Sequence, residues 1–152
     1  MVKFEDMREE SQAWANEYCK ALNNSSDYED AAKDWGVEFE GAMLMVFQPS
    51  GEVEENVTSF VDLKGGKCIG ITLLTPDEDP PREPGFVLSA PMLIWKKLSF
   101  LELDPVQALM TQKLKLEGDL NIIMKFQKAA VLLATTTEKT DRSLFEKYDL
   151  GE

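Results

Sequence analysis

Large apolar side chains recur at helical spacing at the start of the chain. The steps between them are three, seven, four and four residues: Phe4, Met7, Trp14, Tyr18 and Leu22. Such steps place side chains on one face of an α-helix, with polar residues on the other faces. The spacing therefore predicts an amphipathic helix over residues 4–22.

A shorter helix is expected after the loop that follows. Ser26 and Glu29 are spaced as a capping box, in which each side chain satisfies a free backbone amide of the first turn. Apolar residues then share one face up to Trp35, and Gly36 is able to adopt the left-handed conformation that ends many helices. This pattern predicts a helix over about 27–35.

The next part of the chain has the patterns of strands. An apolar run over 39–48 ends at Pro-Ser-Gly, which favours a strand buried on both faces. Two further strands, 56–63 and 67–75, are separated by Gly-Gly, which predicts a hairpin. The segment 75–85 contains four prolines and predicts a surface loop, after which 86–90 returns to strand.

Proline marks the start of two helices in the second half of the chain. One helix is expected over about 91–99. The other has Asp104 as its N-cap and Pro105 as its first residue, and ends near residue 112. The sequence KLKLE, residues 113–117, then alternates strictly between polar and apolar, which is typical of a half-buried strand.

The segment after this strand is apolar on nearly every side. Gly118 suits a sharp turn, and Asp119 suits the N-cap of a helix over 120–134. Such a helix must be covered on two faces. Its two apolar faces are Leu120, Ile123, Met124, Gln127 and Val131, and Ile122, Phe126, Ala129 and Leu133. The charged tail ends in SLFEKYDL, which could form a docked turn of helix.

These elements and the composition predict a single soluble α/β domain. The 152 residues are 43% hydrophobic, which is enough for one core and too few residues for two. We expect N-terminal helices over 3–36, a core over 37–136 and a tail over 137–152.

The charge argues against nucleic acid as a partner. The net charge is -12, whereas a phosphate-binding surface needs clustered Lys and Arg. Residues 91–128 carry six Lys against four acidic residues, so this segment is +2 and the remainder is -14. This segment is either a solvated face or the place where a partner that prefers positive charge would bind.

The residue types exclude several kinds of chemistry. Without His, the chain has no Ser-His-Asp triad, His general base or His metal ligand. Cys19 and Cys68 indicate no disulfide framework, and a strand Cys is more often a small core or surface residue than a nucleophile. The acidic cluster 77–79 is expected to be solvated. We therefore predict no metal site, no cofactor and no enzymatic activity.

The location is expected to be cytoplasmic. The first residues, MVKFEDMREE, lack the apolar region of a secretory signal, and no apolar run is long enough to cross a bilayer. Stable membrane insertion is therefore not expected.

Residues 104–127 resemble the signature of the sterol carrier protein 2 family. The features are a short helix after Asp-Pro with a central Ala, a Lys-Leu-Lys strand, a Gly-Asp turn and an apolar helix. The matching residues are Asp104, Pro105, Ala108, Lys113, Leu114, Lys115, Gly118, Asp119, Met124, Lys125 and Gln127. Residues 59–67 are similar to the family's second strand and hairpin, and residues 22–35 are similar to compact prokaryotic members.

Two positions depart from the family pattern. Gln112 stands where the family usually has Gly, so the turn into the last strand is expected to differ. The ending DLGE lacks a peroxisomal Ser-Lys-Leu address, which fits a prokaryotic cytoplasmic protein.

The resemblance implies an α+β fold, with a five-stranded, mainly antiparallel sheet covered by helices and a hydrophobic tunnel. It further implies non-enzymatic binding and carriage of a fatty acid, acyl-CoA or other lipid, with Gln127 as the single polar contact. Recurring Met residues suit either such a cavity or an ordinary core. The expected lining is Met43, Met45, Phe60, Ile71, Phe86, Leu88, Met92, Trp95, Leu109, Met110, Leu120, Ile123, Met124, Gln127 and Val131.

Two other functions stay open at this point. The chain could act as an accessory or scaffold subunit, or as a homodimer, that presents hydrophobic intermediates to an enzyme. Exposed apolar area on 91–101 beside Lys96 and Lys97 would favour this role. A weaker alternative is an enzyme that relies on carboxylates or on Cys68.

Overall fold

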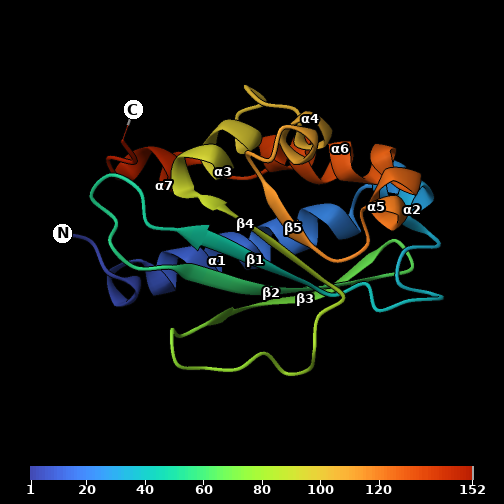
Figure 1. The fold of residues 1–152 in the computed structure, drawn as a ribbon, viewed down its shortest axis with the longest axis horizontal. Helices are drawn as coiled ribbons and strands as arrows, with labels where there is room; N and C mark the ends of the chain where they lie inside the picture. Colours follow the sequence, from blue (N-terminus) through green and yellow to red (C-terminus); the bar gives the residue numbers. More distant parts are fainter. Residues whose placement is uncertain (152) are drawn as a thin grey trace.

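The computed structural model describes residues 1–151 and contains one sheet of five strands in the order β3-β2-β1-β4-β5 (Figure 1). β1 and β4 are parallel, and the other neighbouring pairs are antiparallel. The expected α+β fold with a five-stranded, mainly antiparallel sheet is confirmed. The strands are β1 (Met43–Gln48), β2 (Val57–Lys64), β3 (Lys67–Leu74), β4 (Phe86–Pro91) and β5 (Lys115–Glu117).

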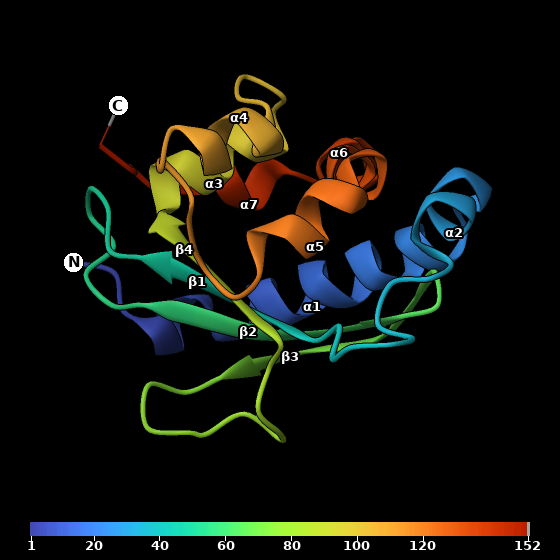
Figure 2. The same ribbon diagram turned by 45° about the vertical axis from the view of Figure 1, so that its right-hand side comes forward.

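The helices lie on one face of this sheet (Figures 1 and 2). Helices α2, α5 and α6 gather toward one end of the molecule, at the right in Figure 1, and α3 and α7 lie toward the other end. The helices are α1 (Phe4–Asn23), α2 (Ser26–Ala32), α3 (Met92–Ser99), α4 (Pro105–Met110), α5 (Leu120–Lys125), α6 (Gln127–Thr135), the 3-10 helix η1 (Thr136–Lys139) and α7 (Ser143–Lys147).

The predicted hairpin between β2 and β3 is confirmed. Gly65 and Gly66 have φ angles of 61° and 80°, which are left-handed values that glycine adopts without strain. Two left-handed residues form the turn whose twist matches that of antiparallel strands. The Gly-Gly pair therefore makes the tight connection possible.

Helix α1 covers the free edge of the sheet. Because β3 is an edge strand, one row of its backbone groups has no neighbouring strand. The side-chain amide of Gln12 donates to the carbonyl of Ile71 at 2.8 Å and accepts from the N–H of Leu73 at 3.0 Å. Asn23 pairs in the same way with both backbone groups of Cys68. These two side chains satisfy the edge where another strand would otherwise bind.

A disulfide joins the same two elements. Cys19 of α1 is bonded to Cys68 of β3, with the Cα atoms 5.5 Å apart. The interpretation of both residues as unpaired cysteines is wrong. They are 49 residues apart in the sequence, and only the packing of α1 on β3 brings them together.

The predicted helix over 120–134 is two helices. The backbone leaves the helical conformation at Phe126, where φ is -117° and ψ is 35°. The Phe126 ring meets the rings of Trp35 and Phe39 at centroid distances of 5.2 and 6.1 Å. The break therefore lies where this half-buried ring packs in an aromatic cluster, which helical spacing alone does not show.

Smaller differences concern the ends of elements. The cap of α2 is Ser25 instead of Ser26, because the Ser25 hydroxyl accepts the N–H of Tyr28 at 3.1 Å. This helix ends at Ala32, and the Trp35 indole beyond it donates to the carbonyl of Gly41. β1 begins later than expected, and β5 has only three residues.

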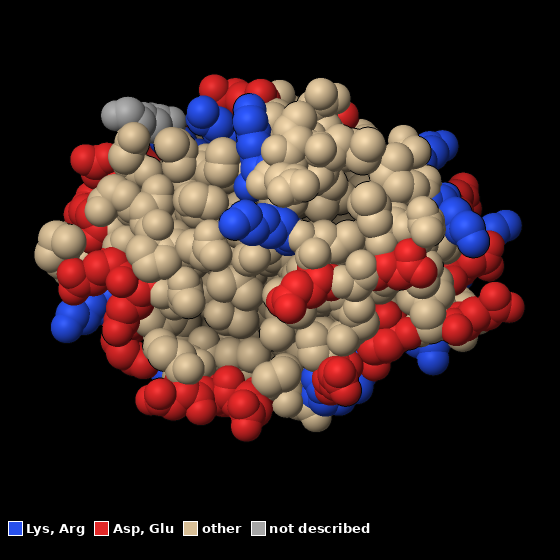
Figure 3. Space-filling view, viewed as in Figure 1, with Lys and Arg blue, Asp and Glu red and all other residues tan. Residues whose placement is uncertain are grey.

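Many acidic side chains lie along the left and lower rim and on the right of the face seen in Figure 3, and a broad uncharged area lies left of its centre. On the sheet face away from the helices, Arg82 of the Pro-rich loop pairs with Glu40 at 2.6 Å and with Asp62 at 2.8 Å. Its guanidinium lies over the ring of Phe60, 5.3 Å from the centroid. The loop is therefore fastened to this side of the sheet.

Candidate functional site

A cavity of about 190 Å³ lies between the sheet and the helices. α1 forms one wall, the inward side chains of β1 to β4 form another, and residues of α3, α4, α5, α6, η1 and α7 complete it. Its position follows from the fold, because all the helices cover one face and do not fill the space beneath them.

Alternation along the strands decides which strand residues reach the cavity. Successive side chains of a strand point to opposite faces. On β1, Met43, Met45 and Phe47 line the cavity, whereas Leu44 packs on the other face with Phe60 and Leu74. The other strands follow the same rule.

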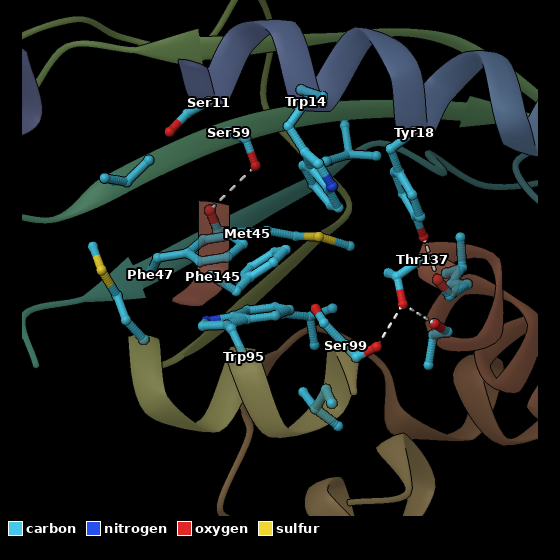
Figure 4. A pocket seen from close by; sticks show the side chains of 18 of the residues that line it. Ser11, Trp14, Tyr18, Met45, Phe47, Ser59, Trp95, Ser99, Thr137 and Phe145 are labelled. Carbon is cyan, nitrogen blue, oxygen red and sulfur yellow. Dashed lines mark hydrogen bonds between the residues drawn. The ribbon is translucent and has the colours of Figure 1, made fainter. Parts of the chain in front are cut away.

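Aromatic rings form much of the wall (Figure 4). Phe47 and Trp95 are stacked at a centroid distance of 4.5 Å, and Trp14 and Tyr18 are stacked at 5.1 Å. Phe145 of α7 packs edge-to-face with Trp14 at 5.2 Å and points into the same space. Rings from α1, β1, α3 and α7 therefore surround one hollow.

Most polar groups in the wall are bonded to the protein itself. The Trp95 indole donates to the carbonyls of Val46 and Ala90, and the Tyr18 hydroxyl donates to the carbonyl of Leu133. The Thr137 hydroxyl donates to backbone carbonyls, one of which belongs to the buried Ser99. No Asp, Glu, Lys or Arg lines the cavity among the described residues. The wall consequently presents mainly carbon and sulfur atoms to whatever enters, with the hydroxyls of Ser11 and Ser59 among them.

Burial raises the pKa of Tyr18 far above its ordinary value, since an ionised phenol would lose its hydration. Tyr18 therefore stays neutral at physiological pH and acts only as a hydrogen-bond donor to α6.

Eight of the residues expected at the site lie on the cavity wall. They come from β1, β3, β4, α3, α4 and α5: Met43, Met45, Ile71, Leu88, Met92, Trp95, Leu109 and Ile123. The other seven lie away from it: Phe60, Phe86, Met110, Leu120, Met124, Gln127 and Val131.

Two of these seven are buried elsewhere in the fold. Phe60 alternates with Ser59 and Val61, which line the cavity, so its ring is on the opposite face of the sheet. Phe86 is on the helix-covered face but packs against Trp35, with ring centroids 5.0 Å apart. Neither ring faces the cavity.

The remaining five expected residues lie away from the cavity because the predicted helix over 120–134 is interrupted and α4 is short. Gln127, expected as the single polar contact, is exposed, as are Leu120 and Val131. Because α5 and α6 are separate helices, their residues do not form the single continuous stripe that the spacing predicted. Met110 is 60% exposed at the end of α4, and Met124 is half-buried outside the cavity.

The sequence interpretation missed the contributions of the two ends of the chain. α1 supplies Met7, Ser11 and Trp14, and the C-terminal segment supplies Leu144 and Phe145. The apolar face of α1 was visible in the sequence. The spacing pattern does not distinguish a helix face that packs in the core from one that lines a cavity. No pattern marked the C-terminal residues as part of a site.

The sequence model of the SCP-2 sterol transfer family matches residues 4–131. The chain belongs to this family. Comparison with curated protein sequences gives no match. The match confirms the resemblance drawn from residues 104–127, and domains of the SCP-2 family bind or transfer lipids.

Solved structures of the SCP-2 fold resemble this chain closely. A crystal structure of sterol carrier protein 2 is 28% identical, with a TM-score of 0.73 over 86% of this chain and 97% of that one. A protein from Thermus thermophilus, described as possibly a sterol carrier protein, is 29% identical, with a TM-score of 0.71 over 84% and 86%. A sterol carrier protein domain of Helicoverpa armigera, 14% identical, shares the fold with a TM-score of 0.56 over 82% and 86%.

Two further observations concern the described part of the chain. None of its helices is both long and apolar enough to span a membrane. Within residues 1–151, no three His, Cys, Asp or Glu side chains are grouped so that they could hold a metal ion.

Proposed function

We propose that this SCP-2 family protein binds the apolar chain of a lipid in its cavity and carries it without changing it chemically. The observation that carries the proposal is the cavity wall, which has no charged side chain around about 190 Å³ of space. The ligand would be a fatty acid, an acyl-CoA or another lipid with an apolar chain. The proposed wall includes Met43, Met45, Ile71, Leu88, Met92, Trp95, Leu109 and Ile123.

Transfer of a chain from water into such a wall is favourable. Each buried methylene contributes about 0.8 kcal/mol, so about eight buried carbons contribute roughly 6 kcal/mol before the chain is ordered. A charged head group inside would be costly because no opposite charge lines the wall. We therefore expect a carboxylate or a larger head group to stay outside, in contact with water.

The wall is suited to chains of different shape. Four of its residues are methionines: Met7, Met43, Met45 and Met92. Methionine is unbranched and adapts to irregular contents. The volume exceeds that of an engineered apolar cavity of about 150 Å³ that binds benzene. Longer chains would fit if these flexible side chains move.

The enzyme alternative receives no support from the cavity. Cys68, the candidate nucleophile, is bonded to Cys19 and is not a free thiol. The wall also contains no carboxylate that could act as an acid or base. Both facts favour a carrier without chemistry of its own.

The scaffold alternative depended on exposed apolar area over residues 91–101. In this segment Leu101, at 42% exposure, is the large apolar side chain that is clearly open to solvent. Met92, Trp95 and Leu98 of α3 are buried. This single side chain does not form a patch, so the lipid carrier is the function we propose.

Filling the cavity tests the proposal. In Met45→Trp, the larger ring would occupy space that the chain needs, and we expect affinity for a fluorescent fatty acid to fall about tenfold or more. Val46→Trp is the matched control, because Val46 follows directly on β1 and points to the opposite face. Its affinity should equal that of the wild type within about twofold.

Equal affinity of both variants, with circular dichroism showing the native fold, would place the binding site elsewhere. Wild-type protein that binds no fatty acid, and that carries no lipid when native mass spectrometry is done on protein from its own cells, would contradict the carrier function itself.

A further inference from the structure

A second, smaller hollow of about 30 Å³ adjoins the cavity. Its lining residues include members of α2, α5 and α6, the helices that gather at the right in Figure 1. Four residues line both spaces: Met43, Ile123, Ala130 and Leu133. The two spaces are therefore neighbours that share one wall, which we call the partition.

The partition is made of side chains that can move without breaking hydrogen bonds. Apart from the weak acceptor sulfur of Met43, none of the four side chains carries a hydrogen-bonding group. Met43 and Ile123 are each 5% exposed, so they touch other side chains and not solvent. A change of rotamer at Met43, Ile123 or Leu133 would connect the two spaces.

The backbone that bears the partition is held in place. The hydroxyl of Tyr18 on α1 donates to the carbonyl of Leu133 on α6. Ile123 is near the end of α5, beside the break at Phe126. Side chains can thus rearrange while the helices keep their positions.

The far end of the smaller hollow is closed by rigid groups. Tyr28 and Leu63 are each 1% exposed, and Trp35 is 5% exposed. The Trp35 indole donates to the carbonyl of Gly41 at 2.9 Å and packs edge-on against Phe126 at 5.2 Å. A chain that passes the partition would consequently stop at these rings.

The smaller hollow suits the end of an apolar chain better than water. Its volume is enough for a few waters, but its wall offers almost no polar partner, and apolar cavities stay dry. Atoms that line such empty space lack van der Waals contacts on that side. The last carbons of a chain would restore those contacts.

We propose that this smaller hollow is a subsite for the terminal carbons of the ligand's chain, and that Ile123 and Leu133 in the partition determine how long a chain the protein accepts. The proposal rests on the proposed lipid-carrier function. It identifies the preferred ligand as one with a slender, unbranched end, because that end must pass between two side chains.

A series of saturated fatty acids of about 8 to about 20 carbons, each competing with a fluorescent fatty acid, tests the subsite. Affinity in the wild type should rise about fourfold per added methylene until the chain reaches the closed end, and then level off. Ala129 lines only the smaller hollow, so Ala129→Leu should fill it and leave the larger cavity unchanged. Short chains should bind as to the wild type, and the longest should lose about tenfold or more.

Ala134→Leu is the matched control on the same helix. Ala134 lines the larger cavity but not the smaller hollow, so this variant should weaken short and long chains alike. Leu133→Ala makes the partition thinner. It should raise the affinity for the longest fatty acids relative to the affinity for the shortest. Because Leu133→Ala creates space and does not crowd the core, it decides the matter if Ala129→Leu fails to fold.

The outcomes separate the two proposals. If the wild type binds no fatty acid of any length, the carrier function is contradicted. If it binds them but Ala129→Leu and Leu133→Ala leave the dependence on chain length unchanged, only the subsite is overturned.

Discussion

Arg82 shows how one side chain fastens a loop that has no regular structure. Its guanidinium binds both carboxylate oxygens of Glu40, at 2.6 and 3.0 Å, and also both oxygens of Asp62. Planar bidentate contacts of this kind suit Arg and not Lys. Together with its position over Phe60, they cover the part of the sheet around Phe60 on the face that carries no helix.

This ion pair makes stability depend on acidity. The hydrogen bonds from Arg82 lower the pKa of Glu40 from 4.5 to about 2. The folded state therefore holds the proton less readily than the unfolded state, so the contribution to stability is complete above pH 4.5 and is lost as pH falls through about 2. Because the pair is partly exposed to solvent, we expect this contribution to be about 1 kcal/mol or less.

Glu40→Gln should accordingly be less stable than the wild type at pH 7, and the difference should shrink as the pH falls below 4.5. Urea midpoints measured from neutral to acid pH would show this. Glu38→Gln, an exposed position two residues away, is the control. A Glu40→Gln deficit that stays constant with pH would point to lost packing and not to the ion pair.

At the scale of elements, α1 and β3 are joined by two independent means. Gln12 and Asn23 satisfy the edge of β3, and the disulfide fixes the end of α1 against the same strand. Since α1 is also a wall of the cavity, these contacts hold that wall against the sheet. Disulfides are uncommon in reducing compartments such as the cytosol. The bond therefore does not support the cytoplasmic location, which stays a prediction.

Reduction of the disulfide should lower the free energy of unfolding by about 2–4 kcal/mol, because it releases a loop that spans 49 residues. Guanidinium midpoints with and without reductant measure this difference. The double variant Cys19→Ala, Cys68→Ala should not respond to reductant at all. If reductant leaves the wild-type midpoint unchanged, the bond contributes nothing to stability.

Periodicity predicted most of the elements but not the site. Alternation and helical spacing depend on neighbours in the sequence, so the β2–β3 hairpin and α1 followed from them. The break at Phe126 depends on Trp35 and Phe39, which are distant in the sequence, and the disulfide depends on a helix meeting a strand. Four of the expected residues, Met43, Met45, Ile71 and Leu88, lie around the cavity as strand alternation places them, because alternation is local. The positions of the residues on the interrupted helix depend on its tertiary contacts.

At the scale of the molecule, the cavity is completed by residues that lie beyond the family match. The match ends at residue 131, and the chain after it contributes cavity-lining residues from α6, η1 and α7 as well as Leu150. Close to its C-terminal end, this segment is held by two neighbouring contacts. Lys147 pairs with Glu10 of α1 at 2.6 Å, and Asp149 exchanges backbone and side-chain hydrogen bonds with Glu52.

The segment therefore crosses from α1 to the loop between β1 and β2 and closes one side of the cavity. Its most inward ring, Phe145, packs against Trp14 at 5.2 Å and Phe100 at 6.5 Å. If the cavity holds a ligand as proposed, this ring is placed to affect how quickly the ligand leaves.

Phe145→Ala should open this side of the cavity. We expect a bound fluorescent fatty acid to dissociate about tenfold faster, because the chain loses contact with the ring and Trp14 loses its neighbour. Stopped-flow displacement measures the rate, and Glu146→Ala, the next residue on α7 and exposed, is the control. Release from Phe145→Ala at the wild-type rate would mean that the ligand leaves past other elements and that α7 only supports the fold.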